Sequence, residues 1–159
     1  MAKPYRKCAG IVIFNANGEV LVGNRIQAEQ SWQFPQGGID PGETAQEAGI
    51  RELYEEVGIK NAILVYEHPN WLFYDFPDWL KGKKINKFQG QTQKWFLFYW
   101  NGQAGDCNLE IHEKEFSEVR FVPLQSTIDL VIDFKRDVYA SIIESFTPKI
   151  SEYLNNIKR

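Results

Sequence analysis

Apolar residues gather in short runs along the chain, and several of these runs predict β-strands. Cys8–Phe14 has the length and character of a buried strand, and Glu19–Arg25 is expected to return beside it. Asn15–Gly18 lies between them and ends in an Asn-Gly pair, which is typical of a hairpin turn. Further extended segments are predicted at Trp32–Pro35, Ala62–Glu67, Thr92–Trp100 and Glu118–Val122.

A helical pattern of apolar positions marks other segments. A helix is predicted from Thr44, because Thr44 can cap it with Glu47 three residues later, and Gly58 can end it. Pro69–Gln91 is aromatic and polar without a clear period, and we expect a long loop there, a candidate lid. Further helices are predicted at Ser126–Val131, Phe134–Phe146 and Ile150–Ile157.

The chain shows no internal repeat and no linker, so one mixed α/β domain over residues 1–159 is predicted. A net charge of -3 gives no general attraction to nucleic acid or to an anionic membrane, so a polyanionic substrate would need a local basic patch and bound cations. Two cysteines, Cys8 and Cys107, are too few for a disulfide framework and indicate a reducing compartment. Without a membrane-length apolar run or a signal-type cleavage region, the cytoplasm is expected, with no membrane and no obligate protein partner.

The predicted helix after Thr44 concentrates negative charge on one face. At 100° per residue, Glu55 and Glu56 fall on either side of Glu52, so the three carboxylates share an arc of roughly 100°. Like charges at these spacings oppose helix formation by roughly 0.2–0.5 kcal/mol per pair, and a bound divalent cation would relieve that repulsion. The apolar stripe of the helix is expected to lie apart, on Ile50, Leu53 and Val57.

Oxygen ligands of this kind suit magnesium or manganese better than zinc. The two histidines, His68 and His112, are isolated in the sequence, which argues against a histidine-built metal site. A glutamate-rich face is also common on solvated helices, so the carboxylates alone leave that alternative open. The preceding loop favours function, because Gly37, Gly38 and Gly42 let the backbone approach the start of the helix.

The segment from Gly37 to Ile59 resembles the Nudix box: Gly, five residues, Glu, seven residues, then Arg-Glu-apolar-x-Glu-Glu-x-Gly-apolar. The resemblance implies an α/β/α sandwich around a mixed sheet, with the box as a loop-helix-loop. It also implies that a water molecule activated by divalent cations attacks phosphorus and cleaves a phosphoanhydride bond. The matching residues are Gly37, Glu43, Arg51, Glu52, Leu53, Glu55, Glu56, Gly58 and Ile59.

The same resemblance implies roles for individual box residues. Glu52, Glu55 and Glu56 are the expected catalytic and metal-binding set, and one of them is expected to take the proton of the water. Arg51 and Glu43 are expected to support the site with Gly37, and the carbonyl at Gln36 or Gly37 is expected to add a ligand. The expected cofactor is Mg2+, with Mn2+ able to substitute, because bound cations neutralise charge and make water a nucleophile near pH 7. The number of cations is left open.

Segments outside the box are similar to one Nudix branch, which contains RNA 5′-pyrophosphohydrolases and hydrolases of diadenosine polyphosphates. By that similarity, Glu115 is expected beside the metals. One departure is that Glu118–Phe121 lacks the usual Trp, and Phe121 is expected to fill its place in the core. The similar segments are Tyr5-Arg6, Trp32–Ile39, Trp71–Pro77, Gln91–Leu97 and Phe134–Tyr139. The expected substrate contacts are Arg6, Arg25, Tyr74, Lys94, Phe134 and Lys135, each with surface charge or core packing as the alternative.

The leading hypothesis is a pyrophosphohydrolase whose substrate is a nucleotide polyphosphate. It would remove pyrophosphate from 5′-triphosphorylated RNA, cleave diadenosine tetraphosphate to ATP and AMP, or do both. A house-cleaning hydrolase of small nucleotides or nucleotide sugars is the second hypothesis, disfavoured by the similar segments outside the box. A non-catalytic nucleotide-binding sensor is the third, disfavoured because such proteins usually lose box glutamates and none is lost here.

Overall fold

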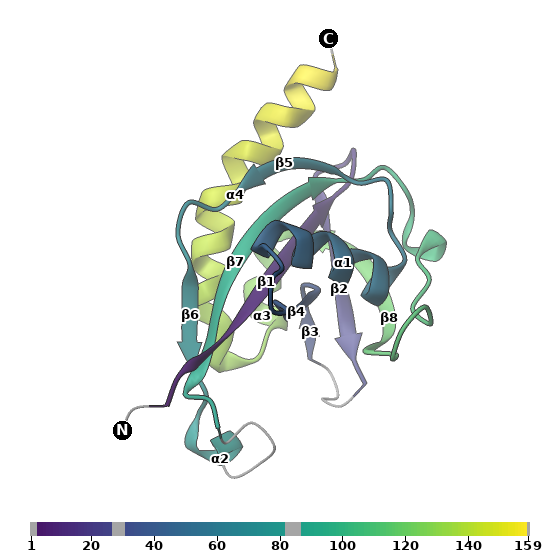
Figure 1. Cartoon of the computed structure of the whole chain (residues 1–159). Coiled ribbons are helices and arrows are strands. Elements are labelled where there is room, and N and C mark those ends of the chain that lie inside the picture. The colour runs from purple at the N-terminus through teal and green to yellow at the C-terminus, as the bar shows by residue number, and fades with distance from the viewer. Residues whose placement is uncertain (1–2, 27–30, 82–86, 159) are drawn as a thin grey trace.

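A mixed β-sheet forms the middle layer of the structure, and helices cover both of its faces (Figure 1). The computed structural model describes residues 3–26, 31–81 and 87–158. The strands are β1 (Tyr5–Phe14), β2 (Glu19–Arg25), β3 (Trp32–Gln33), β4 (Gln36–Gly38), β5 (Ile63–Glu67), β6 (Leu72–Asp75), β7 (Gly90–Tyr99) and β8 (Phe116–Pro123). Five of them follow the path β3-β2-β1-β7-β5, while β4 pairs β1, β6 pairs β7 and β8 pairs β2. The predicted fold class, a mixed sheet between helices, is confirmed.

The helices have the following bounds. They are α1 (Ala45–Val57), α2 (Asp78–Lys81), α3 (Thr127–Leu130) and α4 (Arg136–Ile157), with 3-10 turns η1 (Ala104–Asp106), η2 (Leu124–Ser126) and η3 (Asp133–Lys135). The helix α1 lies on one face of the sheet and α4 on the other (Figure 1). No helix in the described ranges is long and apolar enough to cross a membrane.

The strand β1 sends alternate side chains into two separate cores. Val12 and Phe14 pack in the core under α4, whereas Ile11 and Ile13 pack in the core under α1. Because both faces are covered, the strand is apolar throughout instead of alternating. It runs parallel to β7 over its whole length and antiparallel to β4, from Cys8 to Gly10. This pairing holds the β4 loop directly beside α1.

The boundaries of α1 are the predicted ones. Thr44 forms a full capping box with Glu47, and Gly58 ends the helix in the left-handed conformation at φ 74°. The predicted apolar stripe is wrong in one place, because Ile50 is 49% exposed. Glu56 is buried instead, so the carboxylate face of α1 partly coincides with its buried face.

The prediction of two C-terminal helices is wrong, because α4 continues through Pro148. Proline removes one helical hydrogen bond and crowds the carbonyl four residues earlier. Here both Pro148 and Glu144 are exposed, so water can reach that carbonyl. Phe146 and Ile150 are buried on either side of the proline, and their packing holds the two halves in one helix.

The prediction of a structureless loop over Pro69–Gln91 is also wrong in part. β6 lies within it and pairs antiparallel with β7, and α2 follows. The strand was missed because its inward Tyr74 and its outward Phe73 are both aromatic, which hides the alternation. Residues 82–86 lie outside the described residues, so the lid stays a prediction.

Candidate active site

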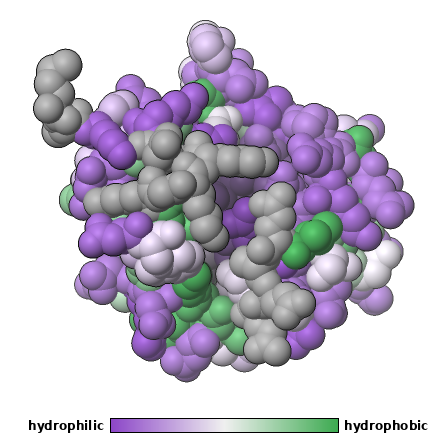
Figure 2. Space-filling model, turned by 90° about the horizontal axis from the view of Figure 1, so that it is seen from below, coloured by the Kyte–Doolittle hydropathy of each residue, from purple (hydrophilic) through white to green (hydrophobic). Residues whose placement is uncertain are grey.

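A polar pocket of about 280 Å³ opens where β4, the end of β2, the beginning of β1 and the segment before β8 meet α1. Its surface is hydrophilic, and Figure 2 shows the molecule hollowed in the middle of this face. Three carboxylates and two arginines from distant parts of the chain come together in it. The lining residues are Arg6, Arg25, Gln33, Gln36, Gly37, Glu52, Glu56, Glu115 and Phe116.

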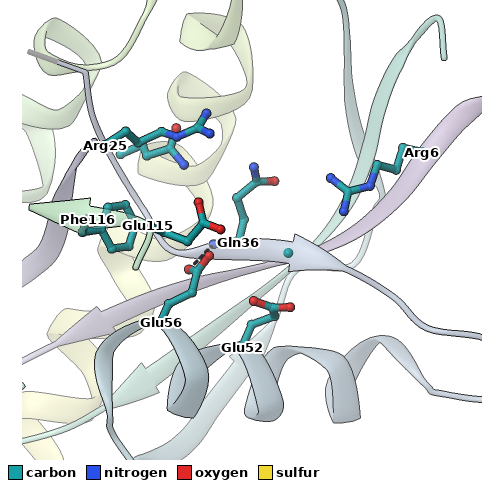
Figure 3. A pocket seen from close by; sticks show the side chains of 9 residues that line it. Arg6, Arg25, Gln36, Glu52, Glu56, Glu115 and Phe116 are labelled. Carbon is teal, nitrogen blue, oxygen red and sulfur yellow. Dashed lines mark hydrogen bonds between the residues drawn. The ribbon is translucent and has the colours of Figure 1, made fainter. Parts of the chain in front are cut away.

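Three of the four residues predicted to hold metal line this pocket. Glu52 and Glu56 point from α1 toward β4, and Glu115 meets them from the segment before β8 (Figure 3). A backbone hydrogen bond of 3.1 Å from Ile26 to the Glu115 carbonyl fixes that segment. Glu55 is not part of the lining; its carboxylate lies 3.5 Å from Arg51 Nη1 and 3.9 Å from His112 Nε2. The predicted set is therefore divided into three pocket carboxylates and one outside.

The pocket carboxylates lie in surroundings that disfavour negative charge. Glu56 is 9% exposed, and its one hydrogen bond within the described residues comes from the Gln36 backbone N–H, 3.1 Å from Oε2. Burial, with the nearby charges of Glu52 and Glu115, raises the pKa of Glu56 well above its ordinary value. Burial also raises the pKa of Glu52. A cation between these groups would reverse both effects.

The close approach of β4 to α1 leaves no room for a side chain at Gly37 unless Glu52 moves. A Cβ built on Gly37 would collide with the Glu52 carboxylate. The backbone of β4 and the acidic face of α1 therefore enclose one narrow space, and any larger residue at position 37 would push Glu52 out of it.

Arg51 ties the loop before α1 to the helix itself. Its guanidinium donates to both oxygens of Glu43 at 2.8 and 2.9 Å, to the Gly38 carbonyl at 2.9 Å and to Glu52 Oε1 at 2.7 Å. The bond from Arg51, with a second from the Asp40 backbone N–H, lowers the pKa of Glu43 to about 2. Arg51 thus fixes the place of one pocket carboxylate.

The donor set fits a hard divalent cation. Carboxylate oxygens from Glu52, Glu56 and Glu115 gather in one pocket, and Glu56 is buried without a cationic side chain bonded to it in the described part of the chain. No three His, Cys, Asp or Glu side chains of the described residues already form a ligand group around one point. The Glu52 carboxylate is paired with Arg51 instead, 2.7 Å from Oε1 to Nη1.

Two of the six predicted substrate contacts line the pocket. Arg6 and Arg25 lie to the two sides of Gln36, and both sit above the α1 carboxylates in the view of Figure 3. The pocket thus combines an acidic floor with a basic rim. Anionic phosphate oxygens can contact the rim while cations occupy the floor.

The other four predicted contacts lie outside the pocket lining. Lys94 is nearly buried in an ion pair with Glu67, 3.2 Å from Nζ to Oε2. Tyr74 is buried in the core, where its ring packs against Phe134 at 5.4 Å. Lys135 is buried and donates to Gln33 Oε1 at 2.9 Å. Their predicted contact with substrate stays a prediction.

Replacing Lys135 with Met is expected to stabilise the protein more at pH 6 than at pH 9, by about 3 kcal/mol. Burial, with the nearby charge of Arg25, lowers the pKa of Lys135 from 10.5 to about 7. Between these values the unfolded chain binds one more proton than the folded protein. The cost of the buried lysine is therefore full below pH 7 and shrinks toward pH 10.5.

Urea unfolding of wild type and Lys135→Met at both pH values measures this difference. Lys114→Met removes an exposed lysine that is paired with Glu110, and serves as the control with no pH dependence. If Lys135→Met changes the free energy of unfolding equally at both pH values, burial does not lower the pKa of Lys135 and this prediction is wrong.

The prediction from sequence missed the side chains of three lining residues, Gln33, Gln36 and Phe116. For Gln36 the sequence comparison implies a role only for the backbone carbonyl. The two glutamines stand out as polar residues in the apolar and glycine-rich stretch Trp32–Gly38, a signal that could have been used. Phe116 carries no such signal, because it packs over Gly23, where an added Cβ would collide with its ring.

Comparisons with known proteins point to one family. The family model described as NUDIX domain matches residues 4–143. An RNA pyrophosphohydrolase of Rhodospirillum rubrum is 44% identical over 141 residues, 88% of this chain and 86% of that protein. One of Bartonella clarridgeiae is 40% identical over 158 residues, 91% of each chain.

Solved structures give the same fold. The Escherichia coli dihydroneopterin triphosphate pyrophosphohydrolase aligns with a TM-score of 0.71 at 19% identity, over 89% of this chain and 98% of that one. A Caenorhabditis elegans Ap4A hydrolase in a binary complex aligns with a TM-score of 0.64 at 25% identity, over 95% of this chain and 98% of that one.

Proposed function

The chain belongs to the NUDIX domain family, and on that premise we propose that it is a pyrophosphohydrolase of 5′-triphosphorylated RNA that also cleaves dinucleoside polyphosphates. The single observation that carries the proposal is the pocket, in which Glu52, Glu56 and Glu115 face Arg6 and Arg25. A phosphoanhydride needs cations on its oxygens and a water molecule as nucleophile, and one pocket offers places for both. The catalytic domain is proposed to be residues 1–159.

The glutamates at this pocket are proposed to bind the cations and to accept the proton of the water. Glu52, Glu56 and Glu115 hold divalent cations, for which we propose Mg2+ with Mn2+ as a substitute. Glu55 is proposed to join this set from the side of Arg51, and one box glutamate takes the proton of the water. When bound, such a cation acts as a Lewis acid on a phosphate oxygen and lowers the pKa of water.

The basic rim binds the substrate and orients it. Arg6 and Arg25 are proposed to hold phosphate oxygens, because a guanidinium matches the geometry of phosphate. Arg51 bonds to Glu43 in the loop and to Glu52 on α1, and so holds the loop against the helix and keeps Glu52 in place. The cytoplasm remains the proposed location.

The choice of substrate is supported by the relatives. The bacterial relatives at 40–44% identity are named RNA pyrophosphohydrolase and match most of this chain. The Ap4A hydrolase structure, at 25% identity, supports dinucleoside polyphosphates as a second substrate class. Both substrates present a polyphosphate attached to a nucleotide, so one pocket can accept both.

A substrate panel with Mg2+ tests the proposal. We expect 5′-triphosphorylated RNA to give pyrophosphate and 5′-monophosphorylated RNA, and diadenosine tetraphosphate to give ATP and AMP. Turnover dominated by single nucleoside triphosphates or nucleotide sugars would favour a house-cleaning hydrolase. Binding of nucleotides without turnover of any polyphosphate would favour a sensor.

A further inference from the structure

A chain of side-chain hydrogen bonds runs from the core to the pocket. The Tyr74 hydroxyl donates to Gln91 Oε1 at 2.8 Å. Gln93 Nε2 donates to the same oxygen at 3.2 Å and to Gln36 Oε1 at 2.7 Å. Gln91 and Gln93 are two residues apart on β7 and therefore project from one face of the sheet. The chain begins at a buried phenol and ends at a side chain that lines the pocket.

The direction of these bonds is set at Tyr74. Burial raises the pKa of its hydroxyl, so the group keeps its proton and must donate it. In the described part of the chain the acceptor is Gln91 Oε1. If the Gln93 amide turned around, its oxygen would face the oxygens of Gln36 and Gln91. If all three amides turned, the Tyr74 proton would lose its acceptor.

The observed orientation of the three amides has one energetic cost. It is smaller than the cost of turning Gln93 alone or of turning all three amides. Gln93 Oε1 is buried without a hydrogen-bond partner within the described ranges. An unpaired buried carbonyl costs about 1–3 kcal/mol, whereas reversing Gln93 would strand its N–H donors and bring like oxygens together. The carbonyl oxygen of the Gln36 side chain is therefore the atom that is bonded to Gln93.

The amide nitrogen of Gln36 is left to face the pocket. Its Oε1 accepts from Gln93, and none of the described residues accepts a hydrogen bond from its Nε2. Figure 3 shows this side chain between Arg25 and Arg6, where an anionic ligand is favoured. The backbone N–H of the same residue donates to Glu56, so Gln36 borders both the rim and the acidic floor.

We propose that the Gln36 side-chain amide donates a hydrogen bond to a phosphate oxygen of the substrate, and that Gln93, Gln91 and Tyr74 are positioning residues that keep its NH₂ end in the pocket. The inference rests on the proposed function, since it needs a polyphosphate substrate. It gives Tyr74 a different role from the direct phosphate contact expected from the sequence. Tyr74 acts through two buried amides.

Steady-state kinetics on diadenosine tetraphosphate with Mg2+ test the donor. Gln36→Met keeps the length of the side chain and removes the N–H groups, so KM should rise about 10- to 100-fold, the loss of a hydrogen bond to a charged group. The bond is present in both ground and transition states, so kcat should change little. A KM within twofold of wild type would overturn the donor role.

A double-mutant cycle tests the positioning residues. Gln93→Met frees the Gln36 amide to rotate and should raise KM, by less than Gln36→Met does. Because Gln93 acts through Gln36, the double variant should have the KM of Gln36→Met alone. If the two effects multiply, Gln93 does not act through Gln36 and the positioning role is wrong.

Two controls keep the outcomes apart. Gln125→Met changes an exposed glutamine that is bonded to Thr147, away from the pocket lining, and should leave KM unchanged. Circular dichroism establishes folding; if Gln36→Met is unfolded, Gln36→Asn, which withdraws the amide by one methylene, must show the same rise in KM. If wild type hydrolyses neither diadenosine tetraphosphate nor 5′-triphosphorylated RNA, the proposed function fails. If wild type is active and KM is insensitive, only this inference fails.

Discussion

Replacing Glu56 with Gln is expected to lower kcat about 1,000-fold while stabilising the metal-free protein. Glu56 is the most buried of the pocket carboxylates. In the role that we propose for it, its loss removes either a cation ligand or the proton acceptor, each worth about 10²- to 10⁴-fold. The neutral amide is isosteric and no longer has to carry charge into a buried site. We expect a gain of about 1–2 kcal/mol in the free energy of unfolding at pH 7 to 8.

The pH dependence of this gain has a definite sign. The pKa of Glu56 is raised in the folded protein from an ordinary value of 4.5. The stability that this carboxyl contributes is therefore full below about pH 4.5 and is lost as the pH rises through the raised pKa. The advantage of Glu56→Gln should be large at pH 7 to 8 and vanish near pH 4.

Kinetics and urea unfolding in EDTA measure the two halves of this prediction. Glu144→Gln, on the exposed side of α4, is the matched control and should change neither kcat nor stability. Added Mg2+ should raise the melting temperature of wild type and not that of Glu56→Gln, because a ligand bound only by the folded state stabilises it. Full activity in Glu56→Gln would show that Glu56 is not needed for catalysis.

Replacing Arg51 with Met is expected to lower kcat about 100-fold and the free energy of unfolding by about 2–3 kcal/mol. The change leaves the carboxylates of Glu43 and Glu52 and the carbonyl of Gly38 without their donor. Glu52 then loses its fixed position. In the proposed mechanism Glu52 holds a cation, and even a small displacement of such a group lowers the rate steeply. Arg51→Lys should recover only part of the loss, because one ammonium cannot reach all three acceptors.

Urea unfolding and steady-state kinetics check this expectation. Arg136→Met removes another arginine–carboxylate pair, an exposed one with Asp129 at 3.4 Å, and should cost less than about 0.5 kcal/mol. If Arg51→Met and Arg136→Met cost equally little, the Arg51 network does not organise the loop.

The features of this fold that depend on nearby residues could be predicted from the sequence. Thr44, Glu47 and Gly58 define both ends of α1 through contacts within the helix, and Asn15–Gly18 turns by its own hydrogen bonds. What depends on distant partners could not be predicted. β6 exists because it pairs with β7, and α4 continues through Pro148 because the core holds it.

The same distinction holds for the pocket. The spacing of the box glutamates and their resemblance to the Nudix box indicate them from the sequence. Only the packing of β4 against α1 decides that Glu56 is buried and that Glu55 is not part of the lining. Glu115 lies far along the chain and joins them through the fold. The ion pair of Lys94 with Glu67 also depends on the fold and is not indicated by the sequence, and the contact of Lys94 with substrate stays a prediction.

A crystal structure of the protein grown with Mn2+, with anomalous diffraction data, tests whether the pocket carboxylates bind divalent cations. We expect anomalous density inside the pocket, within ligand distance of carboxylate oxygens of Glu52, Glu56 and Glu115, and its loss in Glu56→Gln. Manganese bound only elsewhere on the surface, with these three side chains coordinating nothing, would contradict this expectation.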